Sequence, residues 1–343
     1  MLNFCTLFDK NYLSKGLALF DSLNRHCEFV TIYVLCLDDF TFNYLNENKI
    51  NNTIAIHLSE LEDFDKELLA IKHTRTIVEY YFTISPCFPL FLLKKNTELT
   101  WLCSLDADIY FYSNPQSIFN DFENKYSILI TPHKFTKELV ASEKYGIFNV
   151  SFQAFKNNKT GLGCLEKWRS QCIDWCNNVY DDENQRYADQ KYLDTWPIDY
   201  PNEVKILDDS VSGLAVWNIN NYVLEFDSNQ LMSDGERLIF YHFHKLNVIN
   251  KSWIQNGFKH YHVNENKYLD DSIYAPYINA LFDFNEQLLI KKEKKLLNKN
   301  VFSRIINSRQ LFFRFNNKLI RVDTSLILNG YIFLKKKLQR IKN

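Results

Sequence analysis

Apolar segments of strand length alternate with longer amphipathic segments over about the first 110 residues of the chain. Apolar residues at helical spacing predict a helix over Leu13–Leu23. The other apolar runs are short, which predicts buried strands over Leu2–Phe8, Phe29–Leu37, Thr53–Leu58 and Leu99–Leu105. Strands that alternate with helices in this way are typical of an α/β fold with a mainly parallel sheet that helices cover on both faces.

Two further helices are predicted within this region. The segment Ser59-Glu60-Leu61-Glu62 has the pattern of a capping box, which predicts a helix over Leu61–Ile71. The segment Arg75–Leu93 also has a helical pattern. We expect Pro86 and Pro89 to interrupt this second helix, because proline removes a backbone hydrogen bond.

Beyond residue 115 the pattern indicates an α+β continuation of the same core rather than an obvious second domain. A helix is predicted over Leu162–Cys176, and short strands are predicted over Tyr126–Thr131, Asn149–Phe155, Val204–Leu207, Ala215–Asn218 and Leu238–His244. We therefore predict one large domain over residues 1–285 and a basic helical extension over residues 286–343.

Charge is distributed unevenly along the chain, although the formal net charge is −1. Residues 291–343 contain 15 Lys and Arg against two acids, so the rest of the chain is strongly acidic. The segment Leu288–Phe315 mixes basic residues with Leu, Ile and Phe, as an amphipathic helix on an anionic membrane surface does. The alternative is a basic helix that packs on the acidic body. Nucleic acid is not expected, because no binding motif accompanies the charge.

The eight cysteines form no CxxC pair of the metal-binding type. The N-terminus lacks a signal-peptide pattern, and no segment reaches the roughly 18–20 apolar residues that span a bilayer. We therefore expect free thiols and a cytoplasmic protein, peripheral on the inner face of the membrane if the basic extension binds lipid.

Two carboxylates, Asp106 and Asp108, follow the predicted strand Leu99–Leu105. Residues two apart in a strand point to the same face, so their like charges are expected to lie side by side. One interpretation is a solvated loop. The other is a site for Mg²⁺ or Mn²⁺, which prefer carboxylate oxygens and keep positions open for phosphate. The position at the carboxyl end of a central strand favours the second interpretation.

Three further clusters can complete such a site. His242 and His244 alternate with aromatic residues, and we expect both to point from one strand face, with His242 as metal ligand and His244 or Lys245 near the phosphates. Asp189-Gln190 is predicted to begin a short helix, and Asn149 opens a strand. Each cluster also has a structural interpretation. The histidines can be hydrogen-bonded core residues, Asp189-Gln190 can cap the short helix, and Asn149 can cap a turn.

Together these residues resemble the glycosyltransferases of the GT-A fold, which act on nucleotide-diphospho-sugars. The resemblance covers about residues 1–250 and is closest to the glycogenin-like and bacterial lipooligosaccharide galactosyltransferase group. It is carried by the order of eight segments: Phe4–Asp9, Leu13–Leu23, Tyr81–Pro86, Leu105–Asp108, Tyr145–Asn149, Asp189–Leu193, Ala215–Asn218 and His242–His244.

This resemblance implies a Rossmann-like GT-A domain, a nucleotide-sugar donor (most often a UDP-sugar) and Mn²⁺ or Mg²⁺ on the diphosphate. It assigns Asp106, Asp108 and His242 to the metal. The implied nucleotide contacts are Thr6, Asp9, Asp106, Ala107 and Lys245. The implied catalytic residues are Asp189 and Gln190, and the implied sugar or acceptor contacts are Asn149, Asp189, Gln190, His244 and Trp217.

The sequence departs from the related group where Lys245 follows His244, where Val216 precedes the Trp-Asn pair, and where Thr83 replaces an arginine. The implied reaction retains the anomeric configuration; inversion would require Asp189 or Asp209 as a base. The implied acceptor is a glycan or lipid-linked saccharide in bacterial surface polysaccharide synthesis. The alternatives are a non-catalytic binding protein with a relic fold and a metal-dependent phosphohydrolase.

Overall fold

The computed structural model describes residues 1–228, 230–250, 252–289, 310–315 and 318–324. The chain divides into two compact units. The first unit contains residues 1–214 and 236–242, and the second contains the described residues of 215–235 and those from 243 to 324. We describe each unit by itself. The predicted domain boundary between residues 285 and 286 stays a prediction.

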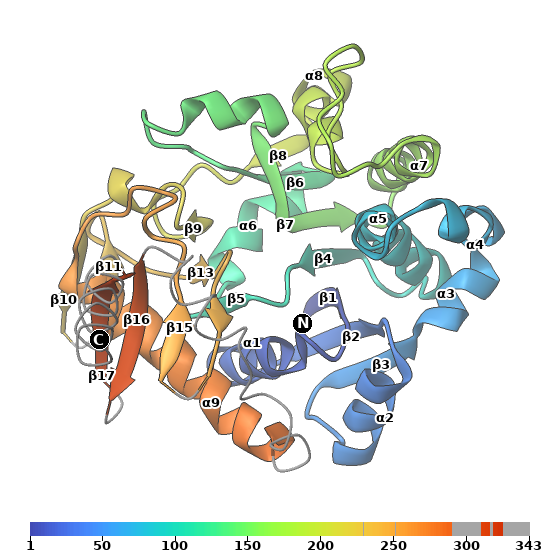
Figure 1. The fold of residues 1–343 in the computed structure, drawn as a ribbon. Helices are drawn as coiled ribbons and strands as arrows, with labels where there is room; N and C mark the ends of the chain where they lie inside the picture. The colour runs from blue at the N-terminus through green and yellow to red at the C-terminus, as the bar shows by residue number, and fades with distance from the viewer. Residues whose placement is uncertain (229, 251, 290–309, 316–317, 325–343) are drawn as a thin grey trace, which may run out of the picture. The chain divides into compact units, whose positions relative to one another are not determined.

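A seven-stranded sheet forms the centre of the first unit (Figure 1). Its strand order is β3-β2-β1-β4-β7-β6-β8. Every neighbouring pair is parallel except those that involve β7, which runs antiparallel to β4 and β6. The predicted mainly parallel sheet is therefore confirmed. The strands are β1 (Leu2–Phe8), β2 (Val30–Cys36), β3 (Thr53–His57), β4 (Trp101–Leu105), β6 (Ile128–Pro132), β7 (Phe148–Lys156) and β8 (Val204–Ile206).

Helices flank this sheet, as the alternating pattern predicted. They are α1 (Leu13–His26), α2 (Asp39–Asn48), α3 (Leu58–Phe64), α4 (Lys66–Ile71), α5 (Ile77–Lys95), α6 (Gln116–Lys125), α7 (Lys159–Asp174) and α8 (Trp196–Asp199). Short 3-10 helices are η1 (Lys72–Thr74), η2 (Val140–Tyr145) and η3 (Lys191–Thr195). Helix α5 packs on β4 and α7, and α7 packs on β7.

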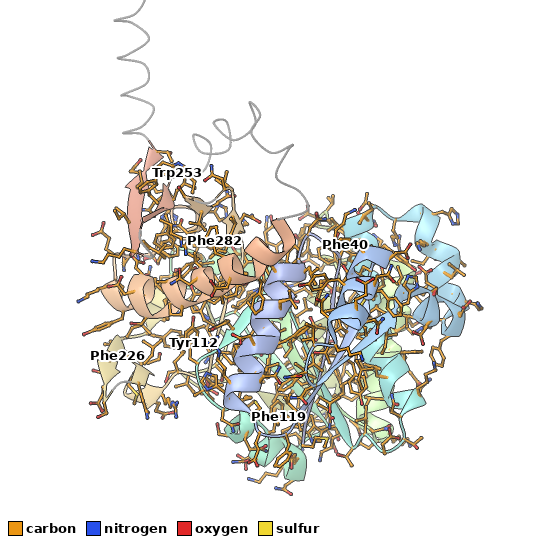
Figure 2. All side chains as sticks on the ribbon, turned by 90° about the horizontal axis from the view of Figure 1, so that it is seen from below. Phe40, Tyr112, Phe119, Phe226, Trp253 and Phe282 are labelled. Carbon is orange, nitrogen blue, oxygen red and sulfur yellow. The ribbon has the colours of Figure 1, made fainter. Side chains whose placement is uncertain are left out.

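Alternate residues of the central strands enter two apolar layers, as the two-residue period of a strand requires. Cys5 and Leu102 belong to the layer that α5 and α7 cover. Their neighbours Phe4 and Trp101 contact Phe119 of α6, with ring centroids 6.0 Å and 4.5 Å apart. Phe119 is labelled in Figure 2. Burial on both faces explains why the strands contain nearly continuous apolar runs.

The predicted helix over Leu61–Ile71 is wrong in two respects. The chain forms two helices, α3 and α4, which meet at Asp65. The capping box uses His57 with Glu60 instead of Ser59 with Glu62. The break follows from the contacts of Asp65, whose side chain accepts the Leu68 N–H as the cap of α4 and also binds a distant arginine.

Helix α5 runs without interruption through Pro86 and Pro89, contrary to prediction. Both prolines are buried, as are most residues of the helix around them. Nearby side chains bond carbonyls of the preceding turn: Cys87 Sγ donates to the Thr83 carbonyl oxygen at 3.2 Å. Burial of a helix that is apolar on most sides outweighs the cost of about 3 kcal/mol that a proline carries inside a helix.

A strand pair outside the large sheet also belongs to the first unit. Strands β5 (Ile109–Phe111) and β13 (Phe240–His242) pair antiparallel, with His242 opposite Ile109. The predicted strand Leu238–His244 is therefore shorter than expected and ends at His242. Lys245 adopts a left-handed φ of 59°, so the chain turns there. The small strands β9 (Leu214–Ala215) and β12 (Glu236–Arg237) lie at the borders of the units.

The second unit contains the sheet β14-β15-β16-β17. Its elements are η4 (Ile219–Asn221), β10 (Leu224–Asp227), β11 (Gln230–Ser233), β14 (Asn247–Val248), β15 (Trp253–Gln255), the π-helix η5 (Leu269–Tyr274), α9 (Ala275–Leu289), β16 (Gln310–Phe315) and β17 (Lys318–Asp323). Arg321 holds Asp270 through two hydrogen bonds of 2.6 and 2.7 Å. The guanidinium of Arg314 lies 4.3 Å from the ring centroid of Phe282 (labelled in Figure 2).

The predicted helical extension is wrong for residues 310–315 and 318–323, which form the hairpin of β16 and β17. Strand β16 contains the apolar run Leu311–Phe313, and its Leu311 and Phe312 are buried, which favours a strand of the sheet over a solvated basic helix. Residues 286–289 are helical, because they form the end of α9. Residues 290–309, 316–317 and 325–343 of the extension lie outside the described residues. No helix of the described chain is long and apolar enough to span a membrane.

Candidate functional site

Asp106, Asp108 and His242 come together at the carboxyl end of β4. One ligand atom from each lies within 4.8 Å of the other two. His242 Nε2 is 3.1 Å from Asp108 Oδ1 and 3.5 Å from Asp106 Oδ2. The cluster combines hard oxygens with an imidazole nitrogen, which is a donor set that Mn²⁺ and Mg²⁺ accept. These three residues therefore fit a divalent cation.

The two carboxylates meet through a turn instead of along a strand. Asp106 follows β4 directly and Asp108 precedes β5, and the Ile109 N–H donates to the Asp106 carbonyl oxygen. The Asp106 N–H donates to the carbonyl oxygen of Ser151 in β7, which fixes the start of the turn to the large sheet. Pairing of β13 with β5 then brings His242 beside the acids across more than 130 residues of sequence.

Lys15 is a fourth member of the cluster, and sequence reasoning missed it. Its Nζ lies 3.1 Å from Asp108 Oδ2, on the oxygen that His242 does not contact, and 4.2 Å from the ring centroid of Tyr12. Lys15 and Asp108 are both buried, whereas the Asp106 side chain keeps 45% of its surface exposed. Of the two acids, Asp106 is therefore the one that solvent reaches.

Burial and neighbouring charge pull the ionisable groups of the cluster in opposite directions. Desolvation raises the pKa of Asp106 to about 6, an effect that the charge of His242 opposes and that of Asp108 reinforces. Burial by itself would lower the pKa of His242, but the attraction of Asp108 outweighs it and raises that pKa. The same balance between burial and Asp108 raises the pKa of Lys15.

Asp189 and Gln190 lie at the same edge of the sheet, just before η3. Asp189 is fully buried, and its Oδ2 has no hydrogen-bond partner among the described residues. Desolvation raises its pKa to about 7, and the charge of Asp106 contributes in the same direction. Trp168 Nε1 donates to the Asp189 carbonyl oxygen at 2.8 Å, which anchors this segment on α7.

Gln190 connects this segment to the loop that leads into β7. Its Nε2 donates to the Tyr145 carbonyl oxygen at 3.1 Å, and a Cβ at Gly146 would lie 3.0 Å from the Gln190 side chain. Asn149 is buried at the start of β7, where its Oδ1 accepts from the Ser151 hydroxyl and N–H. The turn cap that the sequence left open for Asn149 is therefore present, whereas Gln190 makes no side-chain cap hydrogen bond at the start of η3. The predicted contacts of both residues with sugar stay predictions.

The predicted nucleotide contacts Thr6 and Asp9 lie at the carboxyl end of β1. Thr6 is buried, and its Oγ1 has no hydrogen-bond partner among the described residues. Asp9 accepts from the Asn11 N–H and from its side-chain amide. Desolvation, with the charge of Asp9, raises the pKa of Tyr81 to about 12. Ala107 is buried in the turn between the two carboxylates.

No family model matches the chain. Two proteins of Bacillus subtilis (strain 168) do match it. YfnD, an uncharacterized protein, is 28% identical over 277 residues, which covers 80% of this chain and 87% of YfnD. YfnF, also an uncharacterized protein, is 30% identical over 253 residues, which covers 72% of this chain and 82% of YfnF. The chain belongs to the same family as YfnF.

Solved structures of glycosyltransferases are among those that the chain is similar to. The apo form of mouse xyloside xylosyltransferase 1 has a TM-score of 0.46 at 13% identity and covers 71% of this chain and 98% of its own. The apo form of GlyE of Streptococcus pneumoniae TIGR4 has a TM-score of 0.47 at 14% identity, and the match covers 84% of this chain and 64% of GlyE. The galactosyltransferase LgtC has a TM-score of 0.42 at 16% identity, and the match covers 62% of this chain and 75% of LgtC. At these scores no residue role is carried over to this chain.

Three predicted site residues belong to the second unit. Trp217 and His244 have ring centroids 5.2 Å apart, and both lie near Tyr261. Lys245 Nζ lies 5.1 Å from the ring centroid of Tyr261, and burial lowers the pKa of Lys245. His244 does not share a strand face with His242, because the strand ends at His242. The alternation of aromatic and histidine residues was therefore misleading at this position.

His133 is a second residue that the sequence did not single out. It follows β6 at the same sheet edge as Asp106, and its ring stacks on Phe135 with centroids 4.5 Å apart. Burial lowers its pKa to about 4, so it is neutral at ordinary pH. The position of a polar residue directly after an apolar strand was the signal available in the sequence for His133, as it was for Asp106.

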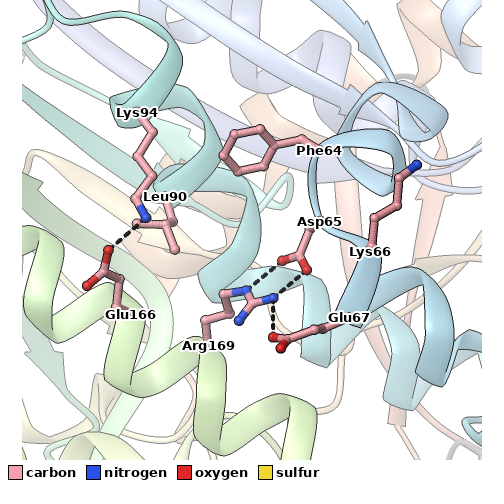
Figure 3. Close-up of a pocket in the computed structure, with 8 residues that line it drawn as sticks. All are labelled: Phe64, Asp65, Lys66, Glu67, Leu90, Lys94, Glu166 and Arg169. Carbon is pink, nitrogen blue, oxygen red and sulfur yellow. Dashed lines mark hydrogen bonds and ion pairs between the residues drawn. The ribbon is translucent and has the colours of Figure 1, made fainter.

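A hollow of the first unit lies elsewhere, between α3, α4, α5 and α7 (Figure 3). Its volume is about 490 Å³, and ion pairs line it. Arg169 binds Asp65 and Glu67, and Lys94 binds Glu166 at 2.7 Å (Figure 3). The lining acids are thus paired with cations, which is typical of a structural ion-pair network rather than of a site.

Proposed function

We propose that this protein is a metal-dependent glycosyltransferase, which moves a sugar from a nucleotide-diphosphate donor, a UDP-sugar in the first instance, to a glycan or lipid-linked saccharide. The observation that carries the proposal is the cluster of Asp106, Asp108 and His242 at the carboxyl edge of a mainly parallel sheet, where such folds bind ligands.

Asp106, Asp108 and His242 would hold Mn²⁺ or Mg²⁺. When bound, the ion supplies Lewis-acid stabilisation of charge on the leaving diphosphate. Asp106 is the exposed acid of the cluster and therefore the one that faces an incoming donor. Thr6 and Asp9 lie at the end of the neighbouring strand β1, where a nucleoside would lie alongside the cluster.

Asp189 and Gln190 would orient the donor sugar and stabilise the reacting carbon. Asp189 has an unsatisfied carboxylate oxygen that is buried with the charge of Asp106 nearby. With its pKa raised to about 7, Asp189 is partly protonated near neutral pH and can either donate or accept a hydrogen bond there. Retention of configuration would require no separate base, and inversion would require Asp189 or Asp209 to take the acceptor proton.

The test is a panel of nucleotide-sugars, each added to the full-length protein with and without MnCl₂, with the melting temperature as readout. A matching donor is expected to raise the melting temperature only when the metal is present. NMR of the product formed with that donor then reports the anomeric configuration. Stabilisation without any turnover would indicate a binding protein, and release of phosphate would indicate a hydrolase.

The role in bacterial surface polysaccharide synthesis and the contact with an anionic membrane remain part of this proposal. Much of the basic extension that would contact lipid lies outside the described residues. Binding to anionic liposomes that truncation near residue 285 removes would support this contact, whereas no binding at low salt would contradict it.

A further inference from the structure

Lys15 occupies a position that neither helix formation nor core packing favours. It is the third residue of α1, and a cation in the first turn of a helix opposes the helix dipole. It is also buried, although lysine is rarely buried without a partner. Both costs are offset at one contact, the 3.1 Å ion pair with Asp108.

The backbone around Lys15 leaves little freedom for its position. A Cβ on the adjacent Gly16 would lie 2.4 Å from the ring of Phe8, so α1 packs directly on this side chain of β1. The Nζ atom of Lys15 also lies over the ring of Tyr12, the residue that precedes α1. The ammonium group is thus directed to Asp108 from a rigid helix, and the contact is built into the fold.

The two oxygens of Asp108 have different partners. Oδ2 faces Lys15 and Oδ1 faces His242. One oxygen is therefore engaged by a permanent cation, and the other points toward the group that completes the metal cluster. A carboxylate held in this way offers a single oxygen to an ion.

We propose that Lys15 is a positioning residue that acts as a built-in counter-cation of the metal centre. It limits Asp108 to one ligand oxygen and weakens the binding of a divalent ion that arrives without a diphosphate. This inference rests on the proposed function, because it concerns the same cluster.

Charge explains why the diphosphate matters. An imidazole that binds a metal ion is neutral, so two carboxylates and one lysine give the ion a site with a single net negative charge, which attracts a divalent ion only weakly. A nucleoside diphosphate adds negative charge beside the ion, so each ligand strengthens the binding of the other. Lys15 would thereby make the protein bind the ion and the donor as a pair.

The test compares wild type with Lys15→Met and Lys15→Arg. Binding of MnCl₂ alone is followed by the EPR signal of free Mn²⁺, and binding of a premixed Mn²⁺–UDP complex is followed by calorimetry. We expect Lys15→Met to bind Mn²⁺ alone at least about tenfold more tightly than wild type. Lys15→Arg keeps the charge and is expected to resemble wild type. The increase in affinity of Lys15→Met over wild type is expected to be smaller, or reversed, for the Mn²⁺–UDP complex.

An affinity for Mn²⁺ alone that is unchanged or lower in Lys15→Met overturns the inference and leaves the proposed function intact. If wild type binds Mn²⁺ neither alone nor with UDP, the proposed metal site and this inference both fail. If Lys15→Met does not fold in metal-free buffer, recovery of its folded state in millimolar MnCl₂ supports the inference, because one cation then replaces another. Failure to fold with MnCl₂ as well overturns it.

Discussion

The first unit contains two clusters in which a buried aspartate meets a cation, and they behave in opposite ways. Asp65 accepts the Leu68 N–H and binds Arg169 through both carboxylate oxygens. Burial would raise the pKa of Asp65, but Arg169 and the helix cap hold it below its ordinary value. Asp106, in the other cluster, has its pKa raised to about 6.

The difference lies in how much of the negative charge the protein itself compensates. The second acid that Arg169 binds, Glu67, is 73% exposed, so water solvates it. In the other cluster the second acid is Asp108, which is buried beside Asp106. The Asp65 cluster is electrostatically complete without a ligand, whereas the Asp106 cluster gains from an added cation. The same residue types therefore make a structural ion pair in one place and a candidate site in the other.

The largest expected effect is on activity at the incomplete cluster. Asp106→Asn removes its exposed carboxylate, and we expect sugar transfer to fall by roughly 10²–10³-fold, the size of effect seen when one electrostatic group of a site is removed. The free energy of unfolding in metal-free buffer should stay equal or rise, because burial disfavours the charged carboxylate of Asp106 and Asp108 repels it. Transfer assays and urea denaturation measure the two quantities. Asp63→Asn, at an exposed helix position, is the matched control, and equal activity in both variants would remove Asp106 from the site.

Removing the cation of the complete cluster should affect stability instead. Arg169→Ala leaves Asp65 buried without its charge partner, and we expect the free energy of unfolding to fall by about 3 kcal/mol. Transfer by the folded fraction should remain close to wild type, because Arg169 belongs to the network of Figure 3. Urea denaturation at pH 7 measures the loss. A stable but inactive Arg169→Ala would reverse the assignment of the two clusters.

The pH dependence of stability should separate Asp189 from Asp65. The folded-state pKa of Asp189 is about 7, above the unfolded value near 3.8, so the folded state keeps a proton that the unfolded state has lost. Asp189 therefore destabilises the fold progressively as pH rises toward 7. The free energy of unfolding of Asp189→Asn minus that of wild type should therefore be about 2–3 kcal/mol larger at pH 8 than at pH 5.

Asp65 has the opposite sign, and its effect lies at lower pH than this range. Its folded-state pKa is lowered, so its contribution to stability is present above the unfolded pKa and is lost as pH falls through the folded one. Chemical denaturation of Asp189→Asn and wild type from pH 5 to 8 measures the first effect. A constant difference between the two proteins over this range would contradict a raised pKa for Asp189.

The smallest effect is expected at the rim of the hollow in Figure 3. Lys94 and Glu166 form an ion pair of 2.7 Å, but their side chains are 41% and 53% exposed. Solvent screens such pairs, so Lys94→Ala should change the free energy of unfolding by less than about 0.5 kcal/mol. A loss close to that of Arg169→Ala would show that the hollow is one cooperative network. High salt should reduce even the small effect.

Regular elements with a strong apolar pattern could be predicted closely. The strands β1 to β4 and the helices α1 and α7 lie where the apolar runs placed them, within a few residues. Prediction failed where a tertiary contact outweighed a local rule. Asp65 broke a helix because Arg169 lies within its reach, and α5 tolerated two prolines because the core encloses it.

The candidate site divides in the same way. Asp106 and Asp108 stood out because two acids directly follow an apolar strand, and this pattern is local. Lys15 did not stand out, because its partner is 93 residues away and helix spacing gives a lysine no reason to be buried. His244 was misplaced because a strand pattern continued in the sequence beyond the point where the strand ends.

By itself, the sequence determined the parallel α/β class, the position of the acids at a strand end and the resemblance to sugar-nucleotide transferases. These depend on apolar periodicity and on neighbours in the chain, which the sequence states directly. The tertiary structure alone decided which cations the acids meet: Lys15 from α1, His242 from β13 and Arg169 from α7. Such partners are chosen by how strands pair and helices pack over distances of about 90 to 130 residues, and this depends on the balance of the whole core.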